Sequence, residues 1–174
     1  INGCLVGSEM CIRDSHAGLN VTSGSQNVFI GKCAVGNRAF TGEHNVAIGR
    51  NAGYLMLSGG CNIAIGNCVA NNNTMTGSNN IYMGCLTACF GSAGNANVFI
   101  GLSAGKCGGG SSCNVFIGCG AGHGGATSSG KCNVYLGVQA GNGNQGNGSG
   151  KDNVAAGTCS LYKISGGYNN VAFG

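Results

Sequence analysis

The hydrophobic pattern of this chain is carried by a five-residue stretch that recurs nine times. In each copy an Asn is followed by Val or Ile, an uncharged residue, a second apolar residue and, at the end, Gly. The copies are 17 to 20 residues apart and begin at Asn27, Asn45, Asn62, Asn80, Asn97, Asn114, Asn133, Asn153 and Asn170. Repetition at so short a period predicts an all-β fold, a parallel β-solenoid or β-roll of about nine coils of 17–20 residues.

The expected coil is a turn, a strand of about five residues, a Gly corner, a second extended piece and a variable loop. Apolar residues at period two, such as Val28 and Ile30, share one face of the strand. We expect that face to form the core, because one coil cannot bury it alone and stacking at about 4.8 Å buries it continuously. Val28, Val46 and Ile63 should then lie above one another.

The nine anchor Asn residues are expected to form a ladder along one edge of the stack, each amide bonding to the coil above or below. The other interpretation is that Asn only satisfies local turn geometry.

The middle residue of the strand predicts how the coils assemble. It is never charged, and five copies are aromatic: Phe29, Tyr82, Phe99, Phe116 and Tyr135. If the neighbouring positions form the core, this aromatic stripe faces outward, and exposed apolar stripes mark interaction surfaces. We therefore expect packing against other chains. A second internal layer within one chain is the alternative.

Twelve cysteines indicate an oxidising compartment and disulfides. Three candidate pairs fit neighbouring coils: Cys113 with Cys132, Cys68 with Cys85, and Cys89 with Cys107. Four cysteines have no evident partner in the next coil, and they would link chains, pair obliquely or remain thiols: Cys33, Cys61, Cys119 and Cys159. Metal binding is the competing interpretation, but there is no Cys-x-x-Cys and the His residues are scattered.

Three glycosylation sequons begin at Asn20, Asn72 and Asn147. All three fall in the variable loop or its equivalent, so glycans there would project from one edge of the stack. Sequons also arise by chance in chains rich in Asn and Ser.

Composition narrows the functional classes. With 37 Gly, no Pro and 7% charged residues, the chain is too apolar for a disordered linker and too Gly-rich for helices. The net charge of +4 comes without a basic run, which argues against nucleic-acid binding, and no apolar run is long enough for membrane insertion. No acid–base or nucleophile–base set can be assembled. We expect no enzyme activity, and no catalytic, cofactor-binding or metal site.

Residues 1–15 differ from the rest in register and character, and hold two of the four acidic residues. They resemble a translated sequencing adapter, so we interpret 1–15 as an assembly scar or, alternatively, a degenerate repeat. Residues 16–174 are expected to form one continuous array, a fragment of a longer chain, because its last repeat has no polar cap.

The pattern Ser/Thr-Gly-x-x-Asn-Val-x-Ile-Gly-x-x-Ala, over residues 23 to 174, resembles the head repeats of trimeric autotransporter adhesins. It is also similar to repeats of phage tail-fibre-like surface proteins. The resemblance implies a left-handed β-roll, assembled as a homotrimer or fibril of identical chains at a cell or virion surface. The expected function is a structural subunit of a secreted extracellular fibre or surface appendage. The alternative is an adhesin that binds glycans or host surface proteins.

Overall fold

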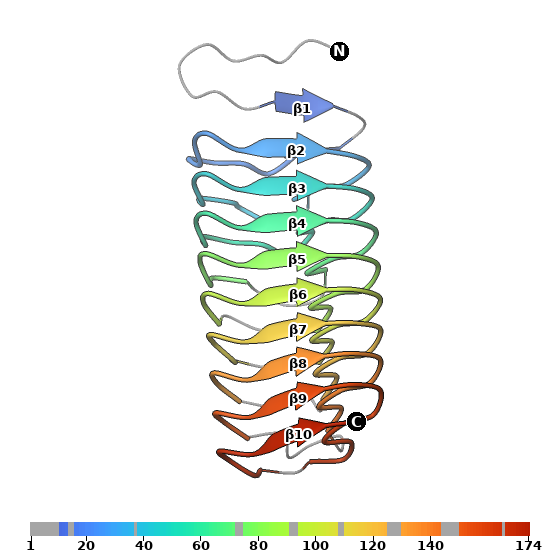
Figure 1. Ribbon diagram of the computed structural model, residues 1–174. Helices are drawn as coiled ribbons and strands as arrows, with labels where there is room; N and C mark the ends of the chain where they lie inside the picture. Colours follow the sequence, from blue (N-terminus) through green and yellow to red (C-terminus); the bar gives the residue numbers. More distant parts are fainter. Residues whose placement is uncertain are drawn as a thin grey trace.

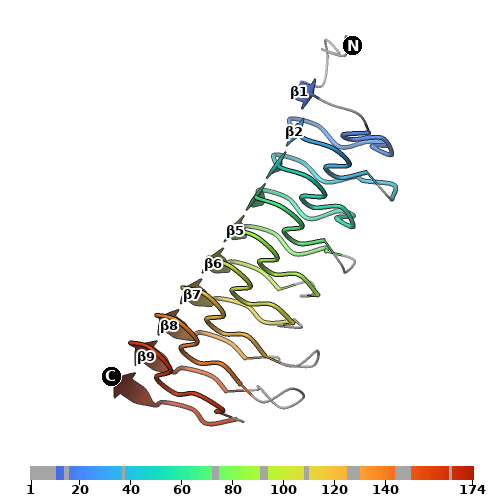
Figure 2. The same cartoon turned by 90° about the vertical axis from the view of Figure 1, so that its right-hand side faces the viewer.

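The computed structural model is an all-β rod of stacked coils (Figures 1 and 2). It describes the backbone of residues 11–13 and residues 16–36, 38–71, 75–90, 94–107, 110–124, 130–143, 150–164 and 166–174. Ten three-residue strands form one parallel sheet, each paired with the next along the chain. They are β1 (Cys11–Arg13), β2 (Val28–Ile30), β3 (Val46–Ile48), β4 (Ile63–Ile65), β5 (Ile81–Met83), β6 (Val98–Ile100), β7 (Val115–Ile117), β8 (Val134–Leu136), β9 (Val154–Ala156) and β10 (Val171–Phe173).

The register of the sheet follows the sequence repeat. Val28 pairs with Val46 and Val46 with Ile63, so equivalent residues lie above one another as predicted. In Figure 1 the chain runs left to right along each strand, turns behind the sheet and descends to the next strand, which makes the coil left-handed. The β-solenoid of 17–20-residue coils is therefore confirmed, with strands two residues shorter than the five-residue stretch that marks them.

The back of each coil has little regular structure but is still bonded to its neighbours. Isolated parallel bridges join Val21 with Phe40, Met56 with Met75, and Lys151 with Tyr168. Backbone N–H groups also donate across coils at the corners, for example from Gly49 to the carbonyl of Ile30 at 2.7 Å. These bonds satisfy backbone groups that would otherwise be stranded in the interior of the rod.

The core lies on the opposite face of the strand from the one we predicted. The middle residue of each strand from β2 to β9 points inward and is buried, and its two neighbours are half-buried or exposed. The aromatic stripe is therefore internal, with exposed fractions between 0% and 6%: Phe29, Tyr82, Phe99, Phe116 and Tyr135. Val28 and Ile30 instead point to the outside of the rod.

The anchor Asn explains this reversal. Asn and the middle strand residue are two positions apart, so period-two alternation places them on the same face. The anchor Asn side chains from Asn27 to Asn153 are buried and bonded inside the rod, at exposed fractions of 0% to 2%. Buried amides need partners, and the interior supplies them from the next coil. The Asn face is therefore the inner one.

The interior is filled by complementary sizes within each coil. Phe99 lies against Gly105, where any Cβ would overlap the aromatic ring. The same pairing joins Phe116 with Gly122 and Tyr135 with Gly141. In the coils where the strand contributes Ala47 or Ala64, the buried side chains of Met56 and Met75 come from the opposite wall. These five coils thus combine a large group on one wall with a small group on the other, which fills the interior.

The segment interpreted as an assembly scar lies mostly outside the described residues. Its residues Cys11–Arg13 form β1, which pairs in register with β2, Cys11 opposite Val28. Part of the segment thus continues the sheet.

Candidate assembly surface

The outward side of the sheet carries two parallel columns of apolar side chains, which we call the outer face. The first column, directly after the anchor Asn, is Val28, Val46, Ile63, Ile81, Val98, Val115, Val134, Val154 and Val171. The second is Ile30, Ile48, Ile65, Met83, Ile100, Ile117, Leu136, Ala156 and Phe173. Ile117 and Leu136 are 40% and 39% exposed. No charged residue occurs in either column from β2 to β10.

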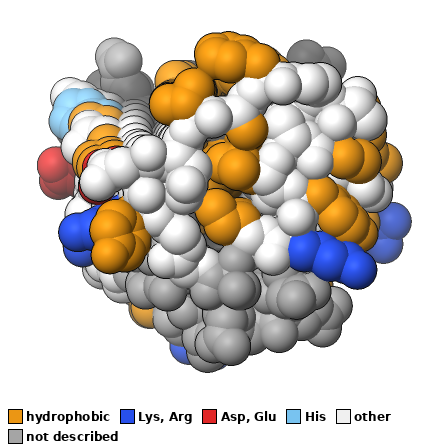
Figure 3. Space-filling model, turned by 60° about the horizontal axis from the view of Figure 1, so that its bottom comes forward, with side chains coloured by type: hydrophobic (Ala, Val, Ile, Leu, Met, Phe, Trp, Pro, Cys, Tyr) orange, Lys and Arg blue, Asp and Glu red, His pale blue; other side chains and the backbone are white. Residues whose placement is uncertain are grey.

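Two corners border the outer face. The N-edge consists of the two residues before each anchor Asn, such as Glu43-His44 and Gly60-Cys61. The C-edge consists of the two residues after each corner Gly, such as Arg50-Asn51 and Asn67-Cys68. In the middle of the rod the C-edge is itself apolar, because Leu102 and Val138 are about half exposed, at 50% and 47%. Figure 3 shows that charged side chains are few around the C-terminal end of the rod, where apolar groups reach the surface in several patches.

The N-edge has an unusual backbone. Its second residue has a positive φ in every coil from β2 to β10, between 55° and 62°, although none is Gly. This left-handed conformation is disfavoured for most side chains, and stacking on the neighbouring coils holds it. The edge is therefore a regular row of side chains presented in one conformation.

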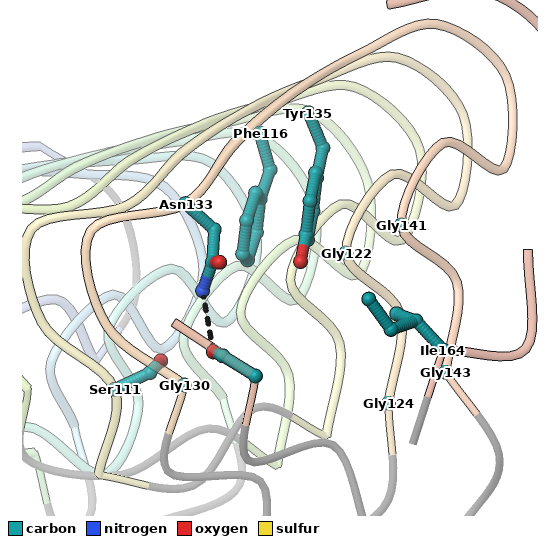
Figure 4. Close-up of a pocket in the computed structure, with 11 residues that line it drawn as sticks. Ser111, Phe116, Gly122, Gly124, Gly130, Asn133, Tyr135, Gly141, Gly143 and Ile164 are labelled. Carbon is teal, nitrogen blue, oxygen red and sulfur yellow. Dashed lines mark hydrogen bonds between the residues drawn. The ribbon is translucent and has the colours of Figure 1, made fainter. Parts of the chain in front are cut away.

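The predicted Asn ladder is present, inside the rod. In each step the next anchor Asn donates its backbone N–H and its side-chain Nδ2 to the Oδ1 of the preceding one. Asn97 donates to Asn80 Oδ1 at 2.9 and 3.1 Å, for example, and Asn114 to Asn97 Oδ1 at 3.0 and 3.2 Å. Nδ2 also donates to a backbone carbonyl of the next coil, as from Asn133 to Gly150 at 2.9 Å (Figure 4). Every polar atom of the buried amide is thus used.

Two buried tyrosines are tied to this ladder. Burial raises the pKa of Tyr82 above its ordinary value and raises the pKa of Tyr135 to about 12, against the opposing effect of hydrogen bonds to Asn97 and Asn153. Their rings belong to a stack that runs from Tyr82 through Phe99 and Phe116 to Tyr135, with centroids 5.2, 4.6 and 4.9 Å apart. The phenols are therefore structural groups held in the neutral form.

These phenols predict alkaline destabilisation. The unfolded chain loses the Tyr135 proton near its ordinary pKa of 10.0, whereas the folded chain keeps it until about 12. The contribution of Tyr135 to the free energy of unfolding is therefore fully present below pH 10. It is lost as pH rises through the folded pKa, by about 3 kcal/mol for a pKa difference of about two. Urea midpoints measured across this range should fall more steeply in the wild type than in Tyr135→Phe. Tyr168→Phe, with a ring 65% exposed, should leave the slope unchanged. Equal slopes in all three proteins would contradict this role.

A small cavity lies behind the last two stacked rings. Phe116 and Tyr135 point into it from one wall and Gly122, Gly124, Gly141 and Gly143 form the other, with Ile164 at its end (Figure 4). Its volume of about 30 Å³ has room for about two water molecules, which is far below the size of a small-molecule site. This cavity is a gap in the packing, where the opposite wall is Gly instead of Met.

The cysteines lie mainly on the edges. The members of each predicted pair are in adjacent coils, but no disulfide joins Cys113 to Cys132, Cys68 to Cys85, or Cys89 to Cys107. Cys113 and Cys132 are exposed neighbours on the N-edge. The Cys68 thiol donates instead to Asn67 Oδ1 at 3.0 Å. Burial raises the pKa of the Cys89 thiol, and the nearby positive charge of Lys106 partly offsets this. Cys61, Cys119 and Cys159 are exposed thiols, and Cys33 is half-buried.

Of the three sequon residues only Asn20 is described, and Asn72 and Asn147 lie outside the described residues. Asn20 is exposed, in a turn on the back of the rod, and its Nδ2 donates to the Gly36 carbonyl at 2.7 Å. A glycan there would lie away from the outer face.

The described residues contain no group of three or more His, Cys, Asp or Glu side chains placed to hold a metal ion. In the same part of the chain no helix is long and apolar enough to cross a membrane. Comparison with protein-family models, curated proteins and solved structures finds no match to this chain.

Sequence reasoning thus found the ladder, but it assigned the inner and outer faces of the strand wrongly and placed the interaction surface on the aromatic stripe, which is buried. A signal for the correct assignment was present. Three of the five coils with an aromatic middle residue, those of Phe99, Phe116 and Tyr135, have Gly six residues later. Compensating sizes mark side chains that share an enclosed space.

Proposed function

We propose that this chain is a structural subunit of a secreted extracellular fibre or cell-surface appendage, assembled from copies of itself as a homotrimer or fibril. One observation carries the proposal: the outer face, an apolar surface that extends along the sheet from β2 to β10. Nine stacked coils at about 4.8 Å make it about 40 Å long, and two columns make it about 10 Å wide. The resulting area of about 400 Å² lies in the size range of the largest apolar patch of a typical protein, and such patches are often functional.

The chemistry of the outer face favours a second copy of the chain as its partner. It carries no charged residue, so a strongly charged partner would gain nothing there and would lose hydration. A matching surface of β-branched side chains at the same 4.8 Å spacing packs best against it, and the chain itself provides one. The aromatic side chains that we first assigned to assembly are used inside the rod instead.

The rod suits a load-bearing role because its bonds are redundant. Each coil is attached to the next by backbone hydrogen bonds, by the buried Asn ladder and by contact between core side chains. Coils interact only with their neighbours, so stability accumulates along the rod. Exposed cysteines and the exposed sequon at Asn20 suit an oxidising, extracellular environment.

Charge substitutions on the outer face test this proposal. Ile100→Lys and Ile117→Lys place a cation in the middle of the outer face, where self-association would bury it. We expect the wild type to sediment as a homo-oligomer, or to form fibres visible by electron microscopy, and the Lys variants to sediment mainly as monomers. Thr76→Lys is the matched control, because Thr76 is exposed on the other side of the coil, and it should assemble as the wild type does.

A wild-type chain that remains monomeric at high concentration would contradict the proposal, as would Lys variants that assemble normally. Circular dichroism should show that all variants keep the β-rod, so that loss of assembly is not loss of folding. Binding of soluble glycans by the monomeric rod would instead favour the adhesin.

A further inference from the structure

Two coils carry a cysteine on both edges of the outer face. The β4 coil has Cys61 on the N-edge and Cys68 as the second residue of the C-edge, and the β7 coil has Cys113 on the N-edge and Cys119 as the first residue of the C-edge. We propose that these residues join neighbouring copies by disulfides, Cys61 to Cys68 of the next copy and Cys113 to Cys119 of the next copy. This inference rests on the proposed self-assembly and specifies how the copies meet.

Within one chain these cysteines cannot meet across the strand. The corner Gly66 lies five residue steps after Cys61, about 17 Å along an extended chain, whereas a disulfide needs Cα atoms within about 7 Å. Neither Cys61 nor Cys119 has a cysteine stacked on it in an adjacent coil. The residues stacked on Cys61 are His44 and Asn79, and those stacked on Cys119 are Leu102 and Val138. Both thiols are exposed and need an external partner to form a disulfide.

Closed symmetry brings the two edges of one coil together. In a ring of identical chains around an axis parallel to the rod, the N-edge of one copy meets the C-edge of the next. Without translation along the axis, each coil meets the same coil of its neighbour. Such a ring can therefore join the N-edge cysteine of the β4 or β7 coil to the C-edge cysteine of the same coil in the next copy.

Charge supports the same register. In the β3 coil the N-edge carries Glu43 and the C-edge carries Arg50, both exposed. The ring that joins Cys61 to Cys68 in the next coil places Glu43 opposite Arg50 of the neighbouring copy. Opposite charges at an interface steer association and fix register. An antiparallel arrangement would instead bring Arg50 near the uncharged C-edge of the β9 coil, which begins at Thr158.

The width of the outer face favours three copies. Six residues from edge to edge span about 20 Å, so three faces arranged as a triangle place each sheet about 6 Å from the axis. That distance is filled by Val and Ile side chains, and the edges meet at the corners of the triangle. Two faces packed against each other would stand about 10 Å apart and hold their edges beyond disulfide reach.

The chemistry needs an oxidant, which we take to be a low-molecular-weight disulfide in the extracellular fluid. The Cys61 thiolate attacks one sulfur of the oxidant and releases one small thiolate, leaving a mixed disulfide on Cys61. The Cys68 thiolate of the neighbouring copy then attacks the Cys61 sulfur and releases the second small thiolate. Two protein thiolates supply two electrons, one S–S bond breaks and one forms, and the protons pass to the released thiolates.

The test uses the full chain in two isotopic forms, ¹⁴N and ¹⁵N, mixed while reduced and then oxidised with glutathione disulfide. Non-reducing gels should show covalent dimers and trimers, and mass spectrometry should find Cys61–Cys68 and Cys113–Cys119 peptides, half of them of mixed isotope. The Cys61→Ser/Cys119→Ser variant should lose nearly all covalent oligomer. The Cys33→Ser/Cys159→Ser variant is the matched control, because its coils lack a cysteine on the opposite edge, and it should cross-link as the wild type does.

Sedimentation under reducing conditions separates this inference from the proposed function. If the reduced chain forms oligomers but oxidation yields only Cys113–Cys132 and Cys68–Cys85 peptides of single isotope, self-assembly stands and the cross-links are wrong. If cross-linking survives in Cys61→Ser/Cys119→Ser, the assignment is also wrong. If the reduced chain is monomeric, the proposed assembly itself fails.

Discussion

Gly101→Ala is expected to destabilise the rod by at least about 4 kcal/mol. Gly101 forms the corner after β6 with a φ of +130°, a conformation that residues with a Cβ rarely adopt. An added Cβ would also lie 2.6 Å from the carbonyl oxygen of Gly118 and 2.8 Å from its carbon, in the backbone of the next coil. The two coils would have to separate, which would strain the hydrogen bonds between β6 and β7 together with the ladder beside them.

The measurement is the urea midpoint under reducing conditions, followed by far-ultraviolet circular dichroism. Gly120→Ala is the control at a neighbouring corner. It also has a positive φ, +66°, but an added Cβ would meet only Gln139 Cγ, at 3.6 Å. Equivalent positions in other coils hold Asn51 and Ser103 with the same sign of φ, so the cost should be about 1 kcal/mol. Similar midpoints for the two variants would show that close stacking at the corner does not limit stability.

Asn80→Ala is expected to lower the free energy of unfolding by about 3 to 5 kcal/mol. In the wild type the backbone N–H of Asn97 donates to Asn80 Oδ1 at 2.9 Å, and Asn80 Nδ2 donates to the Gly94 carbonyl at 3.0 Å. The substitution removes both hydrogen bonds. Both backbone groups would be buried without a partner, and each costs about 1 to 3 kcal/mol. The small cavity left behind adds to this.

Asn79→Ala is the internal control, one residue earlier in the chain. Asn79 is exposed on the N-edge with a φ of +62°, and the same position in the next coil is Ala96. Asn79→Ala should lower the free energy of unfolding by at most about 1 kcal/mol, because Asn adopts that positive φ more readily than Ala does. Equal destabilisation of the two variants, measured as urea midpoints at unchanged slope, would contradict a ladder that bears on stability.

The stacking of coils could be predicted from the sequence because identical positions recur. Asn27, Asn45 and Asn62 each begin the same five-residue stretch, and a repeat that cannot bury its own face must place equivalent residues in register. The ladder followed from the same regularity. Both predictions depend on periodicity alone, which a single sequence displays fully.

The direction of the strand faces could not be predicted in the same way. Val28, Phe29 and Ile30 are all apolar, so the alternation that normally separates inside from outside is missing. The choice depends on the contents and width of the interior, where a Gly lies opposite Phe99 and a second ring, Phe40, packs against Phe29. Width is set by the back of the coil, where residues such as Met56 and Met75 follow no simple repeat.

The disulfides show a different limit. Spacing places Cys113 and Cys132 in adjacent coils, as predicted, but proximity along the rod does not select that pair over a partner in another chain.

The in-register pairing of the sheet has a consequence for how such a chain can change over generations. Every strand offers its neighbours the same bonding pattern, and the Asn ladder accepts any coil that begins with Asn. Duplication or loss of one whole repeat in the gene would therefore lengthen or shorten the rod by one layer without disturbing the layers on either side. Insertions of any other size are tolerated only in the loops, where lengths already differ.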